Sequence, residues 1–261
     1  MAAAAHVPAF RETFLPDTAS TRQYVGAWAV LSVVQYFVAE AAVIGAWAGP
    51  DPYSRRTGLI SDLGAVTCGL YDGRSVCSPL HVLMNASFVV QGLGMLLGAL
   101  LLSSALLRVA ARAGVRVMAS HTGEVPWYTA VAVRLLTGAA GTGTIIVGLV
   151  PEDLETGWHY TGAVMYFIGG SLALLLLGAL WLRQSPLGWL VLAAGAVASA
   201  ALVTAAFTGL DVPEPGTLER LMGYPITIGL SAAGLVIAQR VRQERQVRRA
   251  LAARARVAGS A

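Results

Sequence analysis

The chain has 261 residues, of which 56% are hydrophobic and 12% are charged, and its mean hydropathy is +0.65. Soluble domains carry about 25% charged residues, so this composition excludes an ordinary cytosolic enzyme, a nucleic-acid-binding protein and a disordered chain. The net charge of +4 comes from 18 arginines and no lysine, set against 14 acidic residues. We therefore predict an all-α integral membrane protein that has no nucleic-acid partner.

Six stretches are long and apolar enough to span a bilayer, since a span takes about 20 apolar residues. They predict six transmembrane helices within residues 25–240, with a segment 1–24 before them, a long loop 49–81 after the first helix and a basic tail 241–261. In chain order the predicted spans are Gly26–Ala48, Val82–Leu107, Trp127–Val150, Tyr160–Leu182, Leu187–Phe207 and Leu221–Ala238.

The arginines predict the orientation of the bundle. If both termini are cytoplasmic, 14 arginines fall on the inner side and 4 on the outer side, namely Arg55, Arg56, Arg74 and Arg220. This asymmetry follows the positive-inside rule and predicts a multi-pass protein of the cell membrane. The arginines of the tail are expected to meet anionic lipid head groups, at about 1 kcal/mol for each arginine near the surface.

Two cysteines, Cys68 and Cys77, lie in the long loop that this orientation places outside. Because that side is oxidising, we predict a structural disulfide. A redox role is disfavoured because the closely spaced Cys-x-x-Cys pair is absent from the sequence.

In a chain this apolar, the polar residues next to the spans hold most of the functional information, and they collect on the outer side. If the second, fourth and sixth spans are adjacent, these residues converge in one outer crevice. Histidines beside carboxylates are suited to acid/base chemistry near neutral pH. The candidate catalytic residues are Asp62, His81, Glu152, His159 and Glu219, and the candidate substrate-binding residues are Asn85, Tyr160, Arg220 and Tyr224.

Each candidate also has an ordinary structural explanation. His81 and His159 are equally compatible with interfacial histidines whose hydrogen bonds are satisfied. Asp62 is compatible with a cap of a short helix or turn, and Glu219 with Arg220 is compatible with a plain interfacial ion pair.

Glu40 is a separate candidate because it lies within the first span. A carboxylate there is costly unless it is protonated or paired, so an ionisable residue in a span is a functional candidate by default. We predict a catalytic role for Glu40, either as a neutral acid or as the floor of the outer crevice. Gln35, Tyr36 or a residue of another helix is expected to satisfy it.

The sequence contains no pattern for a metal or a cofactor. The His-Glu-x-x-His spacing, the nucleophile-elbow context and the glycine fingerprints for phosphate and dinucleotides are all missing. We therefore predict neither.

Four motifs together carry a resemblance to a known family. They are Ile60-Ser61-Asp62-Leu63-Gly64, His81-Val82-Leu83-Met84-Asn85 with Gln91-Gly92, His159-Tyr160-Thr161-Gly162-Ala163, and Glu219-Arg220 with Tyr224-Pro225. The chain resembles the bacterial six-helix membrane family called domain of unknown function 998, and more distantly the FRAG/DRAM/Sfk group. The resemblance implies the architecture and the location of a site, but no particular reaction.

Two functions are compatible with these observations. The first is a membrane enzyme with an outward-facing acid/base crevice for a lipid or isoprenoid-like substrate; in one version Glu40 protonates an isoprenoid and starts its cyclisation. The second is a non-catalytic membrane protein, either a small-molecule carrier or an accessory subunit of lipid or envelope machinery. A carrier would be expected to have paired broken helices near the midplane.

Overall fold

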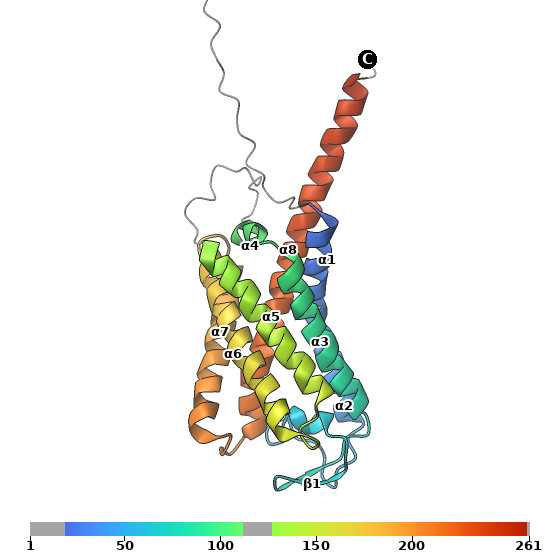
Figure 1. The fold of residues 1–261 in the computed structure, drawn as a ribbon, viewed down its shortest axis with the longest axis vertical. Helices are drawn as coiled ribbons and strands as arrows, with labels where there is room; N and C mark the ends of the chain where they lie inside the picture. The colour runs from blue at the N-terminus through green and yellow to red at the C-terminus, as the bar shows by residue number, and fades with distance from the viewer. Residues whose placement is uncertain (1–18, 112–126, 260–261) are drawn as a thin grey trace, which may run out of the picture.

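The computed structural model describes residues 19–111 and 127–259, and they form an all-α bundle (Figure 1). Within these residues, six helices are long and apolar enough to cross a membrane, so the chain is a multi-pass membrane protein. The prediction of a six-helix polytopic bundle is confirmed.

The first span consists of three pieces in sequence. Helix α1 (Thr21–Leu31) is followed by a 3₁₀ turn, η1 (Ser32–Gln35), and by α2 (Tyr36–Gly45). Ser20 caps α1, because its hydroxyl accepts a hydrogen bond from the Gln23 backbone N–H. The span therefore begins five residues before the predicted start at Gly26.

The second span is shorter than predicted. Helix α3 (His81–Leu101) ends because Leu102 has an extended backbone, and a separate short helix, α4 (Ser104–Val109), follows it. Ser103 caps α4 through its side chain, and its own backbone N–H donates to Gln23 Oε1 of α1 at 2.9 Å. The predicted end at Leu107 is wrong because a new helix cap interrupts the apolar run.

The remaining spans are single helices. These are α5 (Trp127–Leu149), α6 (Thr156–Trp181), α7 (Leu187–Thr208) and α8 (Pro215–Gly259). Helix α8 continues through Pro225 and past the predicted end at Ala238, so the basic tail is a helical extension that projects beyond the bundle (Figure 1).

The spans form a ring in chain order. Helix α1 packs on α3, α3 on α5, α5 on α6, α6 on α7, and α7 on α8, and α8 closes the ring against α1. With an even number of spans, the start of α1 and the end of α8 lie at the same end of the bundle (Figure 1). The opposite end carries the loop between α2 and α3, and we call it the hairpin end.

The loop at the hairpin end has its own structure. Strands β1 (Gly69–Tyr71) and β2 (Arg74–Val76) pair as an antiparallel hairpin. Asp72 and Gly73 form its turn with φ of 46° and 76°, the left-handed region that an Asp-Gly hairpin turn uses. The predicted disulfide is present, and Cys68–Cys77 closes the base of this hairpin.

Neighbouring helices approach closely where glycines face each other. A Cβ atom added to Gly143 of α5 would lie against the Gly162 carbonyl and 2.7 Å from Met165 Cβ, both on α6. Small residues at such crossings let helix backbones pack directly in a membrane.

We predict that Gly143→Ala lowers thermal stability in detergent, because the clash costs about 1–3 kcal/mol and outweighs the helix-propensity gain of about 1 kcal/mol. Gly157→Ala is the matched control, since only Glu155 Oε1, at 3.6 Å, lies near its added methyl group. The control is expected to melt at or slightly above the wild-type temperature. Equal melting temperatures for the two variants would contradict this account of the α5–α6 contact.

Candidate functional site

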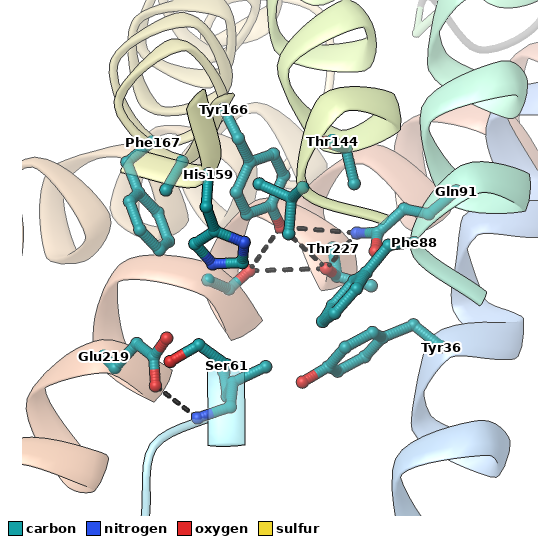
Figure 2. A pocket seen from close by; sticks show the side chains of 14 residues that line it. Tyr36, Ser61, Phe88, Gln91, Thr144, His159, Tyr166, Phe167, Glu219 and Thr227 are labelled. Atoms are coloured by element: carbon teal, nitrogen blue, oxygen red, sulfur yellow. Dashed lines mark hydrogen bonds between the residues drawn. The ribbon is translucent and has the colours of Figure 1, made fainter. Parts of the chain in front are cut away.

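A small cavity lies inside the bundle near the hairpin end, between α2, α3, α5, α6 and α8 (Figure 2). Its volume is about 50 Å³, enough for a few water-sized groups, since one water takes roughly 10–15 Å³ on this scale. It is lined by Tyr36, Ile60, Ser61, Phe88, Gln91, Thr144, Val147, His159, Ala163, Tyr166, Phe167, Glu219, Gly223 and Thr227. A mainly apolar cavity with a few converging polar groups is the usual form of a small-molecule site.

Helix α8 contributes a carboxylate to the cavity. Glu219, Gly223 and Thr227 follow one another at intervals of four residues, so they lie on one helix face, and all three line the cavity. Glu219 Oε2 accepts a hydrogen bond from the Ile60 backbone N–H, which ties the loop to α8. Figure 2 shows the Glu219 side chain pointing toward the same space as Ser61.

Helix α6 contributes an imidazole. His159 is only 7% exposed, and its Nδ1 lies 2.8 Å from the Val150 carbonyl oxygen. Because a carbonyl oxygen can only accept, Nδ1 carries the hydrogen in this arrangement, and Nε2 remains as the nitrogen that can take up a proton. The contact also fixes the orientation of the ring.

Helix α2 contributes a phenol whose hydroxyl has no hydrogen-bond partner in the described part of the chain. Tyr36 is 4% exposed, and its hydroxyl makes no hydrogen bond to any described residue. Its ring stacks on Phe88 with the two centroids 6.1 Å apart, and its hydroxyl points into the cavity (Figure 2). A buried hydroxyl without a partner costs about 1–3 kcal/mol, so this one is poised for a group that enters the cavity.

The inner side of the cavity is a closed hydrogen-bond network between three helices. Gln91 of α3 donates to Thr227 Oγ1 at 2.9 Å and to Tyr166 Oη at 3.3 Å (Figure 2). Tyr166 in turn lies 3.1 Å from Thr227 Oγ1 and donates to the Gly223 carbonyl. This network links α3, α6 and α8 through side chains across the inside of the ring. The assumed adjacency of the second, fourth and sixth spans does not hold in the packing of the helices, because α3 packs on α1 and α5.

A second polar cluster lies on another face of α8. Arg220 pairs with Glu40 of α2 through Nε and Nη2, at 3.2 and 3.1 Å. Tyr224 donates to both oxygens of the same carboxylate, at 2.7 and 2.6 Å. The expectation that a residue of another helix satisfies Glu40 is confirmed, and this pairing favours a structural interpretation of Glu40. Gln35 instead donates to the Ser87 carbonyl.

The remaining donors of Arg220 hold the loop. Nη1 donates to the carbonyls of Arg55, Gly58 and Gly216, and Nη2 donates to Tyr53 Oη at 2.6 Å. With Nε and Nη2 on Glu40, all three nitrogens of the guanidinium are engaged by the protein. Burial raises the pKa of Tyr53 despite the nearby charge of Arg220, so this phenol stays neutral. Glu219 and Arg220 do not form the ion pair that was considered as an ordinary explanation for them, because Arg220 pairs with Glu40.

A third cluster orders the rest of the loop. Asp62, in the 3₁₀ turn η2 (Ser61–Gly64), accepts from the Leu59 N–H at 2.9 Å and pairs with Arg74. Glu152 lies 3.9 Å from the same guanidinium. Burial raises the pKa of Asp62 above its ordinary value, although Arg74 and the Leu59 N–H act in the opposite direction. Asp62 does not cap the turn: it lies inside η2, which has no side-chain cap, and its carboxylate holds the N–H of Leu59 that precedes the turn.

The other predicted site residues serve the loop or lie away from the cavity. Asn85 donates to the Gly64 carbonyl, and His81 Nδ1 contacts the Ser78 carbonyl at the start of its own helix. Tyr160 is 63% exposed. Of the ten predicted catalytic and substrate-binding residues, the cavity brings together only His159 and Glu219.

Several residues of the cavity were not predicted as site residues, notably Tyr36, Gln91, Tyr166 and Thr227. A spacing signal exists for two of them: Tyr166 lies seven residues after His159, and Thr227 lies eight after Glu219, so each shares a helix face with a predicted residue. Tyr36 lies four residues before Glu40 in α2, but that spacing leads to the cluster around Arg220, because Glu40 does not line the cavity.

A carboxylate and an imidazole with a fixed tautomer, held on different helices around one small cavity, can exchange a proton with a bound molecule. Among the described residues, no group of three or more His, Cys, Asp or Glu side chains is placed to hold a metal ion. Comparisons with family models, curated proteins and solved structures gave no match for this chain.

We predict that Arg220→Gln is strongly destabilising, because it leaves the Glu40 carboxylate buried without its cation, a change worth about 3–5 kcal/mol. The double variant Glu40→Gln with Arg220→Gln is expected to recover part of this loss. Arg56→Gln is the control, since Arg56 pairs with Glu214 but its side chain is 75% exposed, and its removal is expected to change stability little. Thermal unfolding in detergent measures all three; equal stability of the two single variants would contradict a structural role for the buried pair.

A second prediction concerns Asp153, which accepts hydrogen bonds from the backbone N–H groups of Val66 and Thr67. Burial opposes ionisation, but these hydrogen bonds outweigh it and lower the pKa of Asp153. A lowered pKa gives stability that is present above the unfolded value, about 3.9, and is lost as pH falls through the folded value.

Asp153→Asn is therefore expected to cost about 1 kcal/mol at neutral pH, and this cost is expected to disappear below about pH 3.9 as pH falls through the lowered pKa of Asp153. The measurement is the difference in unfolding free energy between wild type and variant across this range. Asp211→Asn is the control, because Asp211 is exposed and its side chain makes no hydrogen bond to the described residues. A cost for Asp153→Asn that stays constant with pH would contradict the proposed charge effect.

Proposed function

We propose that the chain is an integral membrane enzyme that carries out acid/base chemistry on a lipid or isoprenoid-like molecule. Glu219 and His159 are the two groups that exchange the proton. The observation that carries the proposal is the cavity itself, which is lined by a carboxylate from α8, an imidazole from α6 and a phenol from α2 whose hydroxyl has no hydrogen-bond partner among the described residues. Membership of the domain of unknown function 998 family is part of the same proposal, and it rests on the sequence motifs.

The hydrogen bonds of His159 and Glu219 leave one atom of each side chain available to a bound molecule. His159 keeps its Nδ1 hydrogen on the Val150 carbonyl, so Nε2 is the position that accepts or returns a proton. Glu219 has Oε2 on the Ile60 N–H, which leaves Oε1 for a molecule that enters the cavity. Water is limited to a few molecules by the cavity's volume, which strengthens each polar contact within it.

The surroundings of the cavity support a substrate drawn from the bilayer. The cavity lies within a bundle of spans, and most of its lining is apolar. We place the protein in the cell membrane with the hairpin end outward, as the arginine distribution favours. On the other side, the helical tail presents the exposed residues Arg242, Arg249, Arg254 and Arg256 toward anionic lipid head groups.

One observation favours the second candidate function, a carrier. The first span is interrupted at Ser32–Gln35, directly before Tyr36, and interrupted spans are typical of transport sites. A carrier would release its lipid unchanged, whereas an enzyme would release a different molecule.

The test is turnover of lipids by protein purified in nanodiscs and supplied with a membrane lipid extract, followed by mass spectrometry. Wild-type protein is expected to convert at least one lipid species. Glu219→Gln and His159→Gln are each expected to reduce the rate by about 100-fold or more, the usual contribution of a general acid or base. Asp211→Asn, which removes an exposed carboxylate, is expected to retain the wild-type rate.

Two results would overturn the proposal. One is the absence of any converted lipid with wild-type protein, which together with lipid carried unchanged between vesicles would identify a carrier. The other is conversion that persists in both Glu219→Gln and His159→Gln.

A further inference from the structure

We infer that the cavity recognises an uncharged hydroxyl group, so that the substrate is a lipid alcohol rather than a lipid phosphate or a lipid amine. This inference deepens the proposed function and rests on it. The observations that carry it are the charges around the cavity, the unpartnered hydroxyl of Tyr36 and the cavity's volume.

The charges disfavour an anionic head group. None of the described residues that line the cavity is a lysine or an arginine, while Glu219 is an acid. Arg220, the residue next to Glu219 in the chain, directs its guanidinium to Glu40, Tyr53 and backbone carbonyls on another face of α8. A phosphate in the cavity would therefore lie beside a carboxylate, and none of the described lining residues would supply a cation to pair with it, in a space where charges are poorly screened.

The hydrogen-bonding groups favour a hydroxyl over an ammonium. Tyr36 Oη is buried without a partner, so its hydrogen needs an acceptor. Glu219 and His159 Nε2, when unprotonated, need a donor. A hydroxyl group donates once and accepts twice, so it can satisfy Tyr36 and one of the two proton-exchanging groups together. An ammonium group only donates, and it would leave the Tyr36 hydrogen unpaired.

The volume is consistent with recognition of a head group. About 50 Å³ holds a hydroxyl and the first carbons of a chain, but not a whole lipid. The apolar lining near the polar groups, Phe88, Val147 and Phe167, would then contact those carbons. The rest of the chain lies outside the cavity.

The experiment measures equilibrium binding of three probes that share one apolar chain: farnesol, farnesyl phosphate and farnesylamine. Wild-type protein in detergent is expected to bind farnesol at least tenfold more tightly than either charged probe. Tyr36→Phe is expected to weaken farnesol binding about tenfold and to leave folding intact, because the phenyl ring still stacks on Phe88. Tyr128→Phe is the matched control, since Tyr128 is 78% exposed and lies at the other end of the bundle, and it is expected to bind farnesol like wild type.

Each other outcome overturns the inference. Tighter binding of farnesyl phosphate would show that an anion is accepted, and tighter binding of farnesylamine would show that the carboxylate selects a cation. Equal farnesol binding by wild type and Tyr36→Phe would show that the Tyr36 hydroxyl does not contact the ligand. Failure of all three probes to bind would show that the cavity is not a binding site for them. Binding is measured without turnover, so failure of this inference can be distinguished from failure of the proposed function. If only the head group is wrong, wild-type protein still converts lipid and Glu219→Gln still reduces that conversion. If the proposed function is wrong, wild-type protein converts no lipid.

Discussion

A guanidinium group inside an apolar bundle is stable only if the protein replaces the water that it has lost. Arg220 meets this requirement with the Glu40 carboxylate, the Tyr53 hydroxyl and three backbone carbonyls. These partners come from the first span, from the loop at the hairpin end and from α8 itself. The ion pair therefore fixes three parts of the chain against one another, and the shape of the hairpin end depends on it.

The position of the cavity follows from this constraint. Successive residues of a helix point about 100° apart, which follows from 3.6 residues per turn. When Arg220 is held against Glu40, the preceding residue Glu219 must face another side, and that side is the cavity. The same clamp holds the loop in place, so that Ile60 and Ser61 cover the space into which Glu219 points. Two adjacent charged residues thus serve different purposes, one structural and one available for chemistry.

The architecture was predictable from the sequence because hydrophobicity alone defines spans in a bilayer. The disulfide was predictable from the two cysteines of a loop that the arginine distribution predicts to be outside. The ends of the spans were less predictable: the apolar run through Leu107 hides the break at Leu102, which a serine cap and a glutamine from another helix create. The hairpin has a local signal in Asp72-Gly73, a dipeptide typical of two-residue hairpin turns.

The site was predictable only in part. Polar residues near the spans included Glu219 and His159, but the sequence does not state which of them share a space. Arg220, Asp62 and Asn85 are as polar as Glu219, yet their partners are loop carbonyls, a loop N–H group and other charges. Those pairings connect residues far apart in the chain, such as Glu40 and Arg220, and no local spacing encodes them. Tyr36 could not be identified because the absence of a hydrogen-bond partner is a property of the folded protein.

The order of the helices has a consequence for how the protein is made. In a ring where each span packs on its predecessor, most contacts can form as the chain leaves the ribosome and enters the membrane, because domains assemble from the amino terminus during synthesis. The seam between α1 and α8 is the exception, since it must wait for the last span to be inserted. Glu40 lies at that seam and remains without its cation until Arg220 arrives, and the cavity is complete only then. Biogenesis therefore ends with the same step that creates the site.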